Sequence, residues 1–167
     1  VGNPNARLRF KINRDDYKNA RMISSPINLL DASPIGDGAA AAVIIPAEYL
    51  KKHNHSSMIT VAASASATDS IAIHDRDDPI WLAAAEKSSR LAYSQAGVQP
   101  GDIDFFEVHD AFSIMSVLTL EACGFAERGQ GPRLGLDEEI ALKGRIPITT
   151  MGGLKARGHP VGATGMY

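Results

Sequence analysis

The stretch DIDFFEVHDAFSIMSVLTLEACG, residues 102–124, decides the fold. Its first part, Asp102–Asp110, has the length and the apolar centre of a buried strand. Its second part, Ala111–Gly124, has almost no polar face, and a helix that is apolar all round belongs in the middle of a large protein. A buried strand that leads directly into a buried helix is the repeating unit of α/β proteins. The sequence therefore predicts an α/β fold.

The segments on either side continue the alternation of strands and helices. The sequence predicts further buried strands at Ala39–Ala47 and Arg145–Met151, and a strand of small and β-branched residues at Ser57–Ala67. The first 35 residues are irregular, with a short helical turn around Asp15–Met22. The polar segment EYLKKHNHSS predicts a domain boundary near residue 55, which divides the chain into units 1–55 and 56–167.

A long helix is predicted over residues 77–98, DDPIWLAAAEKSSRLAYSQAGV. Asp77 or Asp78 caps its start, Pro79 suits its first turn, and Gly97 ends it. Four residues of this helix share an apolar stripe that is expected to face a core: Ile80, Ala84, Leu91 and Ala92.

The composition excludes several classes of protein. The chain of 167 residues is 44% hydrophobic and 22% charged, which is typical of a globular protein. A net charge of −2 leaves no basic footprint for nucleic acid. The longest apolar run, Ala39–Ala47, is much shorter than the roughly 20 residues of a membrane span. The single cysteine, Cys123, excludes an internal disulfide and suggests the cytoplasm. Because the sequence starts at Val1 and stops at Tyr167, we expect it to be part of a longer protein.

Two histidines follow predicted buried strands. His109 lies where the strand Phe105–Val108 meets the apolar helix, a common position for catalytic groups in α/β proteins. The positive end of the helix would favour a neutral imidazole there. The alternative is that His109 or Asp110 only caps the helix.

The second histidine, His159, lies in the glycine-rich stretch GGLKARGHPVGATG, residues 152–165. Glycines allow the backbone to approach a ligand closely, and Pro160 fixes the turn. The alternative is a loop histidine between structural turns. Because each histidine follows a buried strand, the two side chains are expected to converge at one edge of a sheet.

The remaining titratable residues are expected to have ordinary roles. Cys123 is interpreted as a small core residue rather than a nucleophile. His53 and His55 have the spacing of metal ligands but lie in a charged, polar stretch. His74 lies among three aspartates that are typical of a solvated turn, so no metal site is predicted.

The two histidine motifs and several other blocks carry a resemblance to a known family. VHDAFS at residues 108–113 precedes the glycine-rich stretch by some forty residues, and NPNA, DASPIGDGAAAAVI, AGVQPGDIDFFEVHDAF and GFAERGQG agree as well. Together they resemble the carboxyl-terminal half of the thiolase superfamily. Within it, the His-Asp-x-Phe pattern is similar to the lipid-transfer (sterol-carrier) type and the archaeal acetyl-CoA acetyltransferase-like branch, where most thiolases have Asn-Glu-Ala-Phe.

This resemblance implies an architecture and a reaction. Thiolases build an α-β-α-β-α layered core from two similar halves, with a mixed sheet covered by helices, and they usually form dimers. Residues 1–55 would hold the end of the first half and residues 56–167 most of the second. The reaction is acyl transfer between coenzyme A thioesters, by Claisen condensation or thiolysis. Coenzyme A enters as substrate, and no cofactor or metal is expected.

The resemblance also implies roles for individual residues. His159 would activate the family's nucleophilic cysteine and help to form the oxyanion hole, and His109 would replace the family's asparagine there. Ser89 would match a serine that contacts the pantetheine arm. Four further residues are expected near the coenzyme A thioester: Phe112, Gly153, Gly158 and Pro160.

Three features depart from the family pattern. The nucleophilic cysteine belongs to the first half, and the second catalytic cysteine of the family would come after Tyr167, so Cys123 matches neither. Thr149-Thr150-Met151 stands where relatives usually have Asn-Thr-Ser. This chain alone is therefore expected to be inactive. The alternatives are a non-catalytic thiolase-like scaffold or lipid/acyl-CoA-binding partner, and a related β-ketoacyl or hydroxymethylglutaryl synthase.

Overall fold

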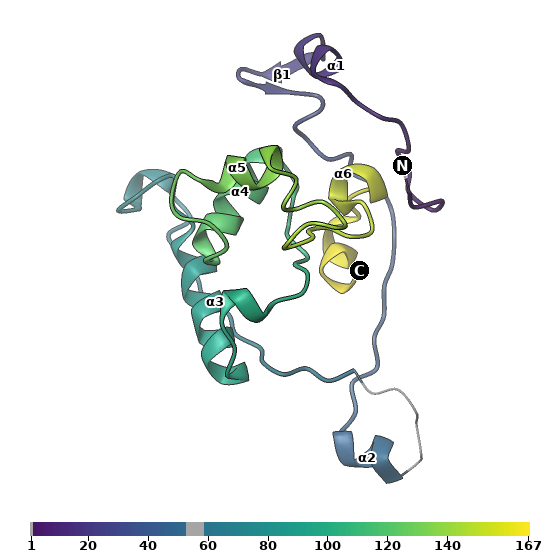
Figure 1. Ribbon diagram of the computed structural model, residues 1–167, viewed down its shortest axis with the longest axis vertical. Helices are drawn as coiled ribbons and strands as arrows, with labels where there is room; N and C mark the ends of the chain where they lie inside the picture. The colour runs from purple at the N-terminus through teal and green to yellow at the C-terminus, as the bar shows by residue number, and fades with distance from the viewer. Residues whose placement is uncertain (1, 53–58) are drawn as a thin grey trace.

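The computed structural model describes residues 2–52 and 59–167. A small hairpin lies at one end of the molecule, a body of helices lies in the middle, and helix α2 (Ala47–Lys52) lies at the other end (Figure 1). No helix among the described residues is long and apolar enough to cross a membrane. The predicted domain boundary near residue 55 falls outside the described residues.

The N-terminal hairpin region begins with a short capped helix. Helix α1 (Arg14–Lys18) starts at Asn13, whose side chain accepts hydrogen bonds from the backbone of Asp15 and Asp16. Asp16 in turn accepts the Asn13 N–H at 2.8 Å, which completes a capping box. Strands β1 (Met22–Ser24) and β2 (Ile27–Asn28) then pair antiparallel. The predicted helical turn around Asp15–Met22 is confirmed.

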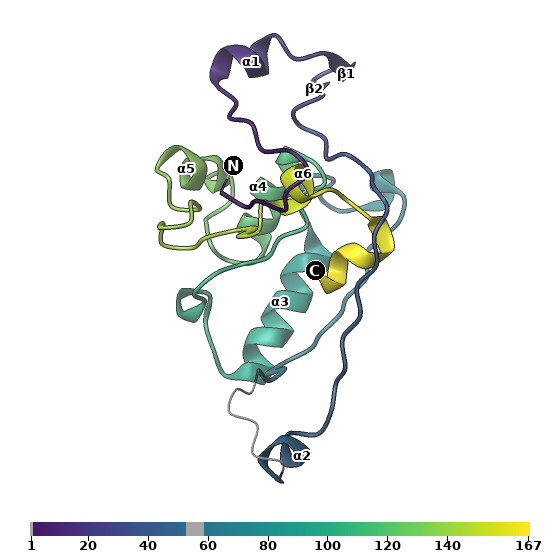
Figure 2. The same ribbon diagram turned by 90° about the vertical axis from the view of Figure 1, so that its right-hand side faces the viewer.

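The body contains four α-helices and three 3₁₀ turns. The α-helices are α3 (Ala83–Ala96), α4 (Ser113–Ala122), α5 (Gly131–Leu136) and α6 (Gly153–Arg157). The 3₁₀ turns are η1 (Ile73–Asp75), η2 (Pro100–Asp102) and η3 (Val161–Met166). Turned by 90°, the molecule shows α6 and η3 beside the long open stretch that leads to α2 (Figure 2).

Helix α3 ends where the sequence predicts but starts later. Gly97 closes it in the left-handed conformation at φ +71°, and its N–H donates to Tyr93 O. The predicted start at Asp77 or Asp78 is wrong, because the Asp78 backbone and side chain instead accept the N–H groups of Trp81 and Ile80 in a separate turn. The predicted apolar stripe is buried only in part: Ala84 and Ala92 are half-buried, whereas Leu91 is exposed and Ile80, which lies before the helix, is 62% exposed. The neighbouring Tyr93 donates its hydroxyl to Cys123 O, so α3 does contact the end of α4.

The hydrophobic core lies between α4, α5 and the segments that flank them. Five buried residues form it: Leu120, Cys123, Phe125, Leu134 and Ile146. Phe106 and Ile148 pack against this cluster, and the rings of Phe106 and Phe125 lie 4.9 Å apart between centroids. The core interpretation of Cys123 is thereby confirmed.

Helix α5 forms in a polar segment of the chain. Its first residue, Gly131, donates its N–H to the buried carboxylate of Glu121 at 2.8 Å. Pro132 suits a first helical turn, and Leu134 turns into the core. This buried leucine attaches the short helix to the body.

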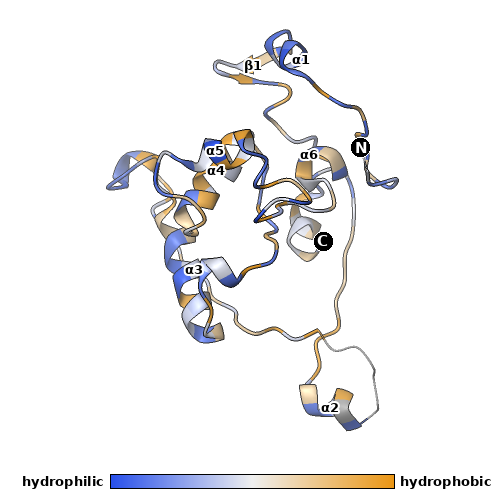
Figure 3. Cartoon of the chain, in the orientation of Figure 1, coloured by the Kyte–Doolittle hydropathy of each residue, from blue (hydrophilic) through white to orange (hydrophobic). Residues whose placement is uncertain are grey.

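Two predicted strands, Ala39–Ala47 and Ser57–Ala67, are open stretches that are neither paired nor buried over the described residues; Ser57 and Met58 lie outside those residues. Residues 39–46 carry Val43, which is 90% exposed, and residues 59–70 carry Ile59, which is 99% exposed. Figure 3 colours the open stretch before α2 toward the hydrophobic end of the scale. The prediction of burial is wrong for this chain, because a strand is buried only when other strands and helices cover it. The described residues supply no such cover.

Isolated parallel bridges mark the strands on which the two histidines depend. Phe106 bridges Ile148, so the predicted strands Phe105–Val108 and Arg145–Met151 lie side by side. Phe106 N–H donates to Pro147 O at 2.8 Å, and Thr149 N–H donates to Phe106 O at 3.1 Å. A second parallel bridge joins Ile35 to His159. The sheet edge predicted from the sequence is therefore present in reduced form.

Buried Asp31 ties the hairpin region to the body. It is 6% exposed and accepts hydrogen bonds from Ser113 Oγ at 2.6 Å, Asn28 N at 2.9 Å and Tyr17 Oη at 2.9 Å. Its backbone oxygen accepts Ser113 N–H, which satisfies the first turn of α4. From α6, the Lys155 ammonium donates to Leu29 O and Ala32 O, both at 2.6 Å.

Changing Asp31 to asparagine should destabilise the protein in a way that depends on pH. Burial alone would raise the pKa of Asp31, but the hydrogen bonds from Ser113, Asn28 and Tyr17 outweigh it and hold the pKa below its usual value. The carboxylate therefore stabilises the folded state above the unfolded pKa of about 3.9, and this contribution is lost as pH falls through the lower folded value.

We expect Asp31→Asn to lower the free energy of unfolding by about 2 kcal/mol at pH 7. The difference from wild type should shrink at pH 3, as measured by urea denaturation. Exposed Asp104→Asn serves as the control and should change little at either pH. A difference in the free energy of unfolding between variant and wild type that is the same at pH 7 and pH 3 would contradict the role of the Asp31 carboxylate.

Candidate functional site

The first histidine, His109, follows buried Val108 and lies just before α4. Neither it nor Asp110 caps that helix: the N-cap is Phe112, which makes no side-chain cap bond. The Asp110 carboxylate instead accepts the N–H of Leu154, in the first turn of α6, at 2.9 Å. The alternative of a simple helix cap is therefore wrong, and Asp110 connects the His109 segment to α6.

The second histidine, His159, follows α6 and is held by its backbone. Its N–H donates to Pro34 O at 2.9 Å, and its carbonyl accepts Gly36 N–H at 3.2 Å. Gly158 reaches this position at φ +105°, which favours glycine. The His159 ring is fixed as well, because Nδ1 lies 2.8 Å from Thr164 Oγ1 in η3.

The structure brings the two imidazoles together. The rings of His109 and His159 lie 5.1 Å apart between centroids and meet edge to face at 76°. Residues fifty positions apart in the sequence thus share one site, held by Asp110 on one side and by the Pro34–Gly36 backbone on the other. That these histidines are catalytic stays a prediction.

The electrostatic surroundings favour a neutral His159. Burial lowers the pKa of this imidazole most, and the neighbouring His109 and Arg157 lower it further, against a smaller opposing effect of Asp110. Burial also raises the pKa of Asp110, although the Leu154 N–H, His109 and Arg157 oppose this. A neutral imidazole can accept a proton near neutral pH, as a general base requires.

Arg157 is a site residue that sequence reasoning missed. Its guanidinium stacks over the Tyr167 ring at 4.4 Å from the centroid. Among the described residues, its Nη1 is a buried polar atom with no hydrogen-bond partner. The signal was present in the sequence, since Arg157 directly precedes Gly158-His159, but a basic residue in a glycine-rich stretch reads as solvated.

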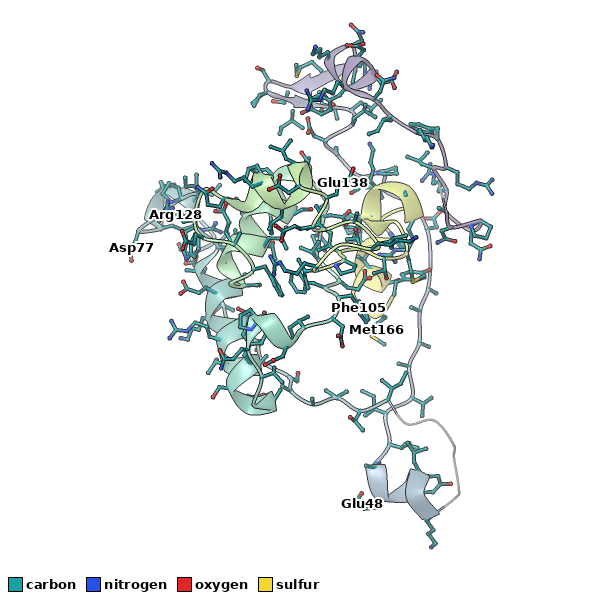
Figure 4. All side chains as sticks on the ribbon, in the orientation of Figure 1. Glu48, Asp77, Phe105, Arg128, Glu138 and Met166 are labelled. Atoms are coloured by element: carbon teal, nitrogen blue, oxygen red, sulfur yellow. The ribbon has the colours of Figure 1, made fainter. Side chains whose placement is uncertain are left out.

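A cavity of about 170 Å³ lies beside the histidine pair and is lined by His109 but not by His159. Its lining includes His109, Arg157, Thr164, Tyr167, Glu107 and Met151. Figure 4 shows how densely side chains crowd the region between α4 and α6, in contrast to the sparse stretch leading to α2, where Glu48 is labelled. The cavity joins an imidazole, a cation, hydroxyl groups and the Glu107 carboxylate, of which Oε1 accepts the N–H and the hydroxyl of Thr150. The imidazole and the guanidinium suit a polar group that acquires negative charge.

The residues expected at the thioester lie at different distances from this cavity. Gly153 lines it, and Gly158 and Pro160 line an adjoining cavity of about 310 Å³. Phe112 is exposed at the start of α4, where it bridges Ala32. Their contact with a thioester stays a prediction.

Ser89 and Cys123 belong to another part of the molecule. Ser89 lies on α3, donates to Glu86 O at 3.0 Å, and hydrogen-bonds the Cys123 thiol. Burial raises the pKa of Cys123 despite this bond, so its thiol is kept protonated and unreactive. The structure does not bring Ser89 to the histidine pair, and its predicted contact with pantetheine stays untested.

No cluster of three or more metal-ligating side chains occurs among residues 2–52 and 59–167. His74 in η1 lies 3.6 Å from Asp75 on the surface. His53 and His55 lie outside the described part of the chain.

Comparison with known proteins identifies the family. Residues 65–167 match the family described as thiolase C-terminal domain-like. The chain belongs to this family. An acetyl-CoA acetyltransferase of Methanothermobacter thermautotrophicus is 44% identical over 164 residues, which cover 98% of this chain and 43% of that protein. This confirms the resemblance stated from the motifs, including its archaeal branch.

Other relatives extend the comparison. An acetyl-CoA acetyltransferase of Methanocaldococcus jannaschii is 38% identical and aligns with 96% of this chain and 42% of its own length. Sterol carrier protein 2 of Rattus norvegicus is 31% identical and aligns with 99% of this chain and 31% of its own length. The chain thus spans less than half the length of these relatives.

A solved structure confirms the fold. The Ltp2–ChsH2(DUF35) aldolase superposes with a TM-score of 0.74 at 21% sequence identity, over 92% of this chain and 41% of that one. Together with the family match, this confirms the predicted α/β, thiolase-like fold.

Gly153→Ala should disturb the connection between the two histidine segments. A Cβ there would collide with the Asp110 carboxylate, and φ at this position is +59°, which side chains rarely adopt. We expect loss of the Asp110–Leu154 hydrogen bond and destabilisation by about 1–3 kcal/mol, measured by urea denaturation. The matched control is Gly162→Ala, because a Cβ at Gly162 meets nothing within 4 Å. Equal stability of the two variants would contradict the role of Asp110.

Arg157→Gln should raise the pKa of His159, because it removes a positive charge that disfavours the imidazolium. The value should stay below the usual one, since burial is the largest cause of the shift. An NMR titration of the His159 ring measures this change. Tyr167→Leu keeps the charge while removing the stacked ring, and Arg90→Gln removes a charge on exposed α3. A pKa that rises equally in all three variants would refute the charge effect.

Proposed function

We propose that this chain supplies the histidine pair of a thiolase-type acyltransferase that acts on acyl-CoA thioesters. The observation that carries the proposal is the edge-to-face contact of His109 and His159 at 5.1 Å, on a chain that belongs to the thiolase family. The relatives named acetyl-CoA acetyltransferase support acetyl transfer in particular.

The geometry suits proton transfer at His159. Because Thr164 engages Nδ1, Nε2 is the nitrogen that would meet a reacting thiol or substrate. A neutral imidazole takes the proton of a thiol and so converts it into the thiolate that attacks a carbonyl carbon. The carbonyl oxygen then gains negative charge, and N–H donors placed beforehand at that oxygen stabilise the transition state by several kcal/mol. We propose that His109 donates an N–H to this oxygen alongside His159.

The nucleophile must come from elsewhere. Cys123 is buried in the core with a raised pKa, at the C-terminal end of α4, and does not line the histidine cavity. We infer that a segment outside this sequence supplies the reactive cysteine, as the family pattern implies. The exposed apolar stretches 39–46 and 59–70 offer the surface on which such a segment would pair. A homodimer or larger complex of the whole protein is part of this proposal.

The proposed reaction requires coenzyme A thioesters as substrates and draws on no resident cofactor or metal. A cytoplasmic location stays a prediction, since it rests on the single cysteine alone.

A second candidate is a non-catalytic lipid- or acyl-CoA-binding protein. It is favoured by the burial of the one thiol of the chain and by relatives named sterol carrier protein 2 and non-specific lipid-transfer protein-like 2. A β-ketoacyl or hydroxymethylglutaryl synthase is a further alternative, tested by supplying acetyl-CoA and acetoacetyl-CoA together and assaying condensation.

A chimera tests the main proposal. This chain replaces the matching 43% of the Methanothermobacter acetyl-CoA acetyltransferase, and thiolysis of acetoacetyl-CoA is measured. We expect turnover in the chimera and none in the isolated chain. His159→Ala should reduce kcat by about 10²–10⁴-fold because it removes a general base. His109→Ala should reduce it by about 10²-fold because it removes an oxyanion donor.

The control is His74→Ala, an exposed histidine on η1, which should leave turnover unchanged. A folded chimera that binds acyl-CoA without turnover would favour the binding candidate. Turnover by the isolated chain that survives alkylation of Cys123 would contradict the need for an external cysteine. Full activity in both histidine variants would refute the proposal.

A further inference from the structure

We propose that the Met151 side chain closes an apolar cavity beside the histidine site and so restricts the acyl group of the thioester to short chains. This inference rests on the acyl-CoA function proposed above and deepens it by naming a residue that sets substrate length. It is carried by two cavities, the wall between them, and the exposure of Met151.

The apolar cavity has a volume of about 560 Å³. This lies within the range of small-molecule sites, about 300–1,000 Å³. Its lining includes the side chains of Ala6, Ile140, Ala141, Leu142 and Ile148. Three polar residues, Asn3, Thr149 and Thr150, also line it, and no charged side chain does. The absence of charge among these lining residues suits a hydrocarbon chain better than the phosphates of coenzyme A.

Met151 is common to this cavity and to the smaller cavity at the histidines. The smaller one contains His109 and Arg157, which suit a polarised carbonyl, and Met151 lines both. A substrate whose carbonyl lies at the histidines would therefore have to pass Met151 before its chain entered the apolar cavity. Met151 is the residue placed to block or admit that chain.

The backbone around Met151 is fixed, which leaves its side chain as the movable element. Its carbonyl accepts a hydrogen bond from Asn3 Nδ2 at 2.9 Å. On the preceding residue, both the N–H and the hydroxyl of Thr150 donate to Glu107 Oε1 at 2.8 Å. Glu107 belongs to the lining of the histidine cavity, so this pair of bonds forms the rest of the wall.

The Met151 side chain can block the opening and can also be displaced by a longer acyl chain. Met151 is 48% exposed and not locked into the core. Methionine is unbranched and flexible, so it can fill an irregular opening. Moving the side chain aside costs free energy. A chain that enters the cavity gains the transfer of each methylene out of water, but only after this side chain has moved. Short acyl groups avoid that displacement.

The test compares thioesters of different length in the chimera described above. We expect Met151→Ala to raise the ratio of kcat/KM for 3-oxooctanoyl-CoA over acetoacetyl-CoA by about tenfold, the size of a small change in an apolar pocket. Met151→Leu keeps the volume of the side chain and should leave the ratio within about twofold of wild type. Leu136→Ala, which removes an exposed apolar side chain of α5 outside both cavities, serves as the remote control.

Filling the apolar cavity should reverse the gain. Ala141→Leu, added to Met151→Ala, takes up the space that the longer chain would occupy, and the ratio should return toward wild type. An unchanged ratio in Met151→Ala, with activity on acetoacetyl-CoA retained, would overturn the inference.

A direct binding measurement separates this inference from the proposed function. The dissociation constants of octanoyl-CoA and acetyl-CoA are measured by calorimetry on the 167-residue chain with and without Met151→Ala. Tighter binding of octanoyl-CoA alone in the variant supports the barrier even if the chimera has no turnover. Turnover of neither thioester by the folded wild-type chimera refutes the acyltransferase proposal, whereas equal octanoyl-CoA binding by both proteins refutes the barrier.

Discussion

The hydrogen bond between the Asp110 carboxylate and the Leu154 N–H is the interaction on which the histidine site depends. It joins the segment that carries His109 to the first turn of the helix that leads into His159. The close fit of Gly153 against the same carboxylate leaves no room for a side chain, so the carboxylate and the helix end are locked together. With this contact in place, the Phe106–Ile148 bridge positions the backbone that leads to His109, and the Thr164 hydroxyl orients the His159 ring.

Sequence reasoning predicted the site better than it predicted the strands. The glycine-rich motif around His159 and the strand–helix junction at His109 each carry a local signal, and both histidines were expected to converge. The role of Asp110 does not follow from the sequence, because its partner Leu154 lies some forty positions away. Arg157 is close to His159 in the sequence, but a basic residue in a glycine-rich stretch is typical of a solvated loop. A sequence pattern can indicate the role of a residue from its neighbours in the chain. It cannot indicate a hydrogen bond to a residue that is distant in the sequence.

The strand predictions failed for a different physical reason. The apolar runs at residues 39–46 and 59–70 do have the composition of central strands, and the chain is extended there. What they lack is cover: a central strand is stabilised by neighbours on both edges and by helices on both faces. This chain spans less than half the length of its acetyl-CoA acetyltransferase relatives. The apolar composition of the two runs fits strands packed between neighbours, whereas the described residues leave both runs exposed. Part of the apolar stripe predicted for α3 is exposed in the same way, at Ile80 and Leu91.

The attachment of His159 to Pro34 and Gly36 carries an architectural consequence. The two main-chain hydrogen bonds join residues 34–36 to residue 159, so the position of the imidazole is set by two segments more than a hundred residues apart in the sequence. A displacement of the Pro34–Gly36 segment would move the ring without any change in a side chain. The His159 ring is therefore correctly placed only when this early segment is seated against the end of the chain.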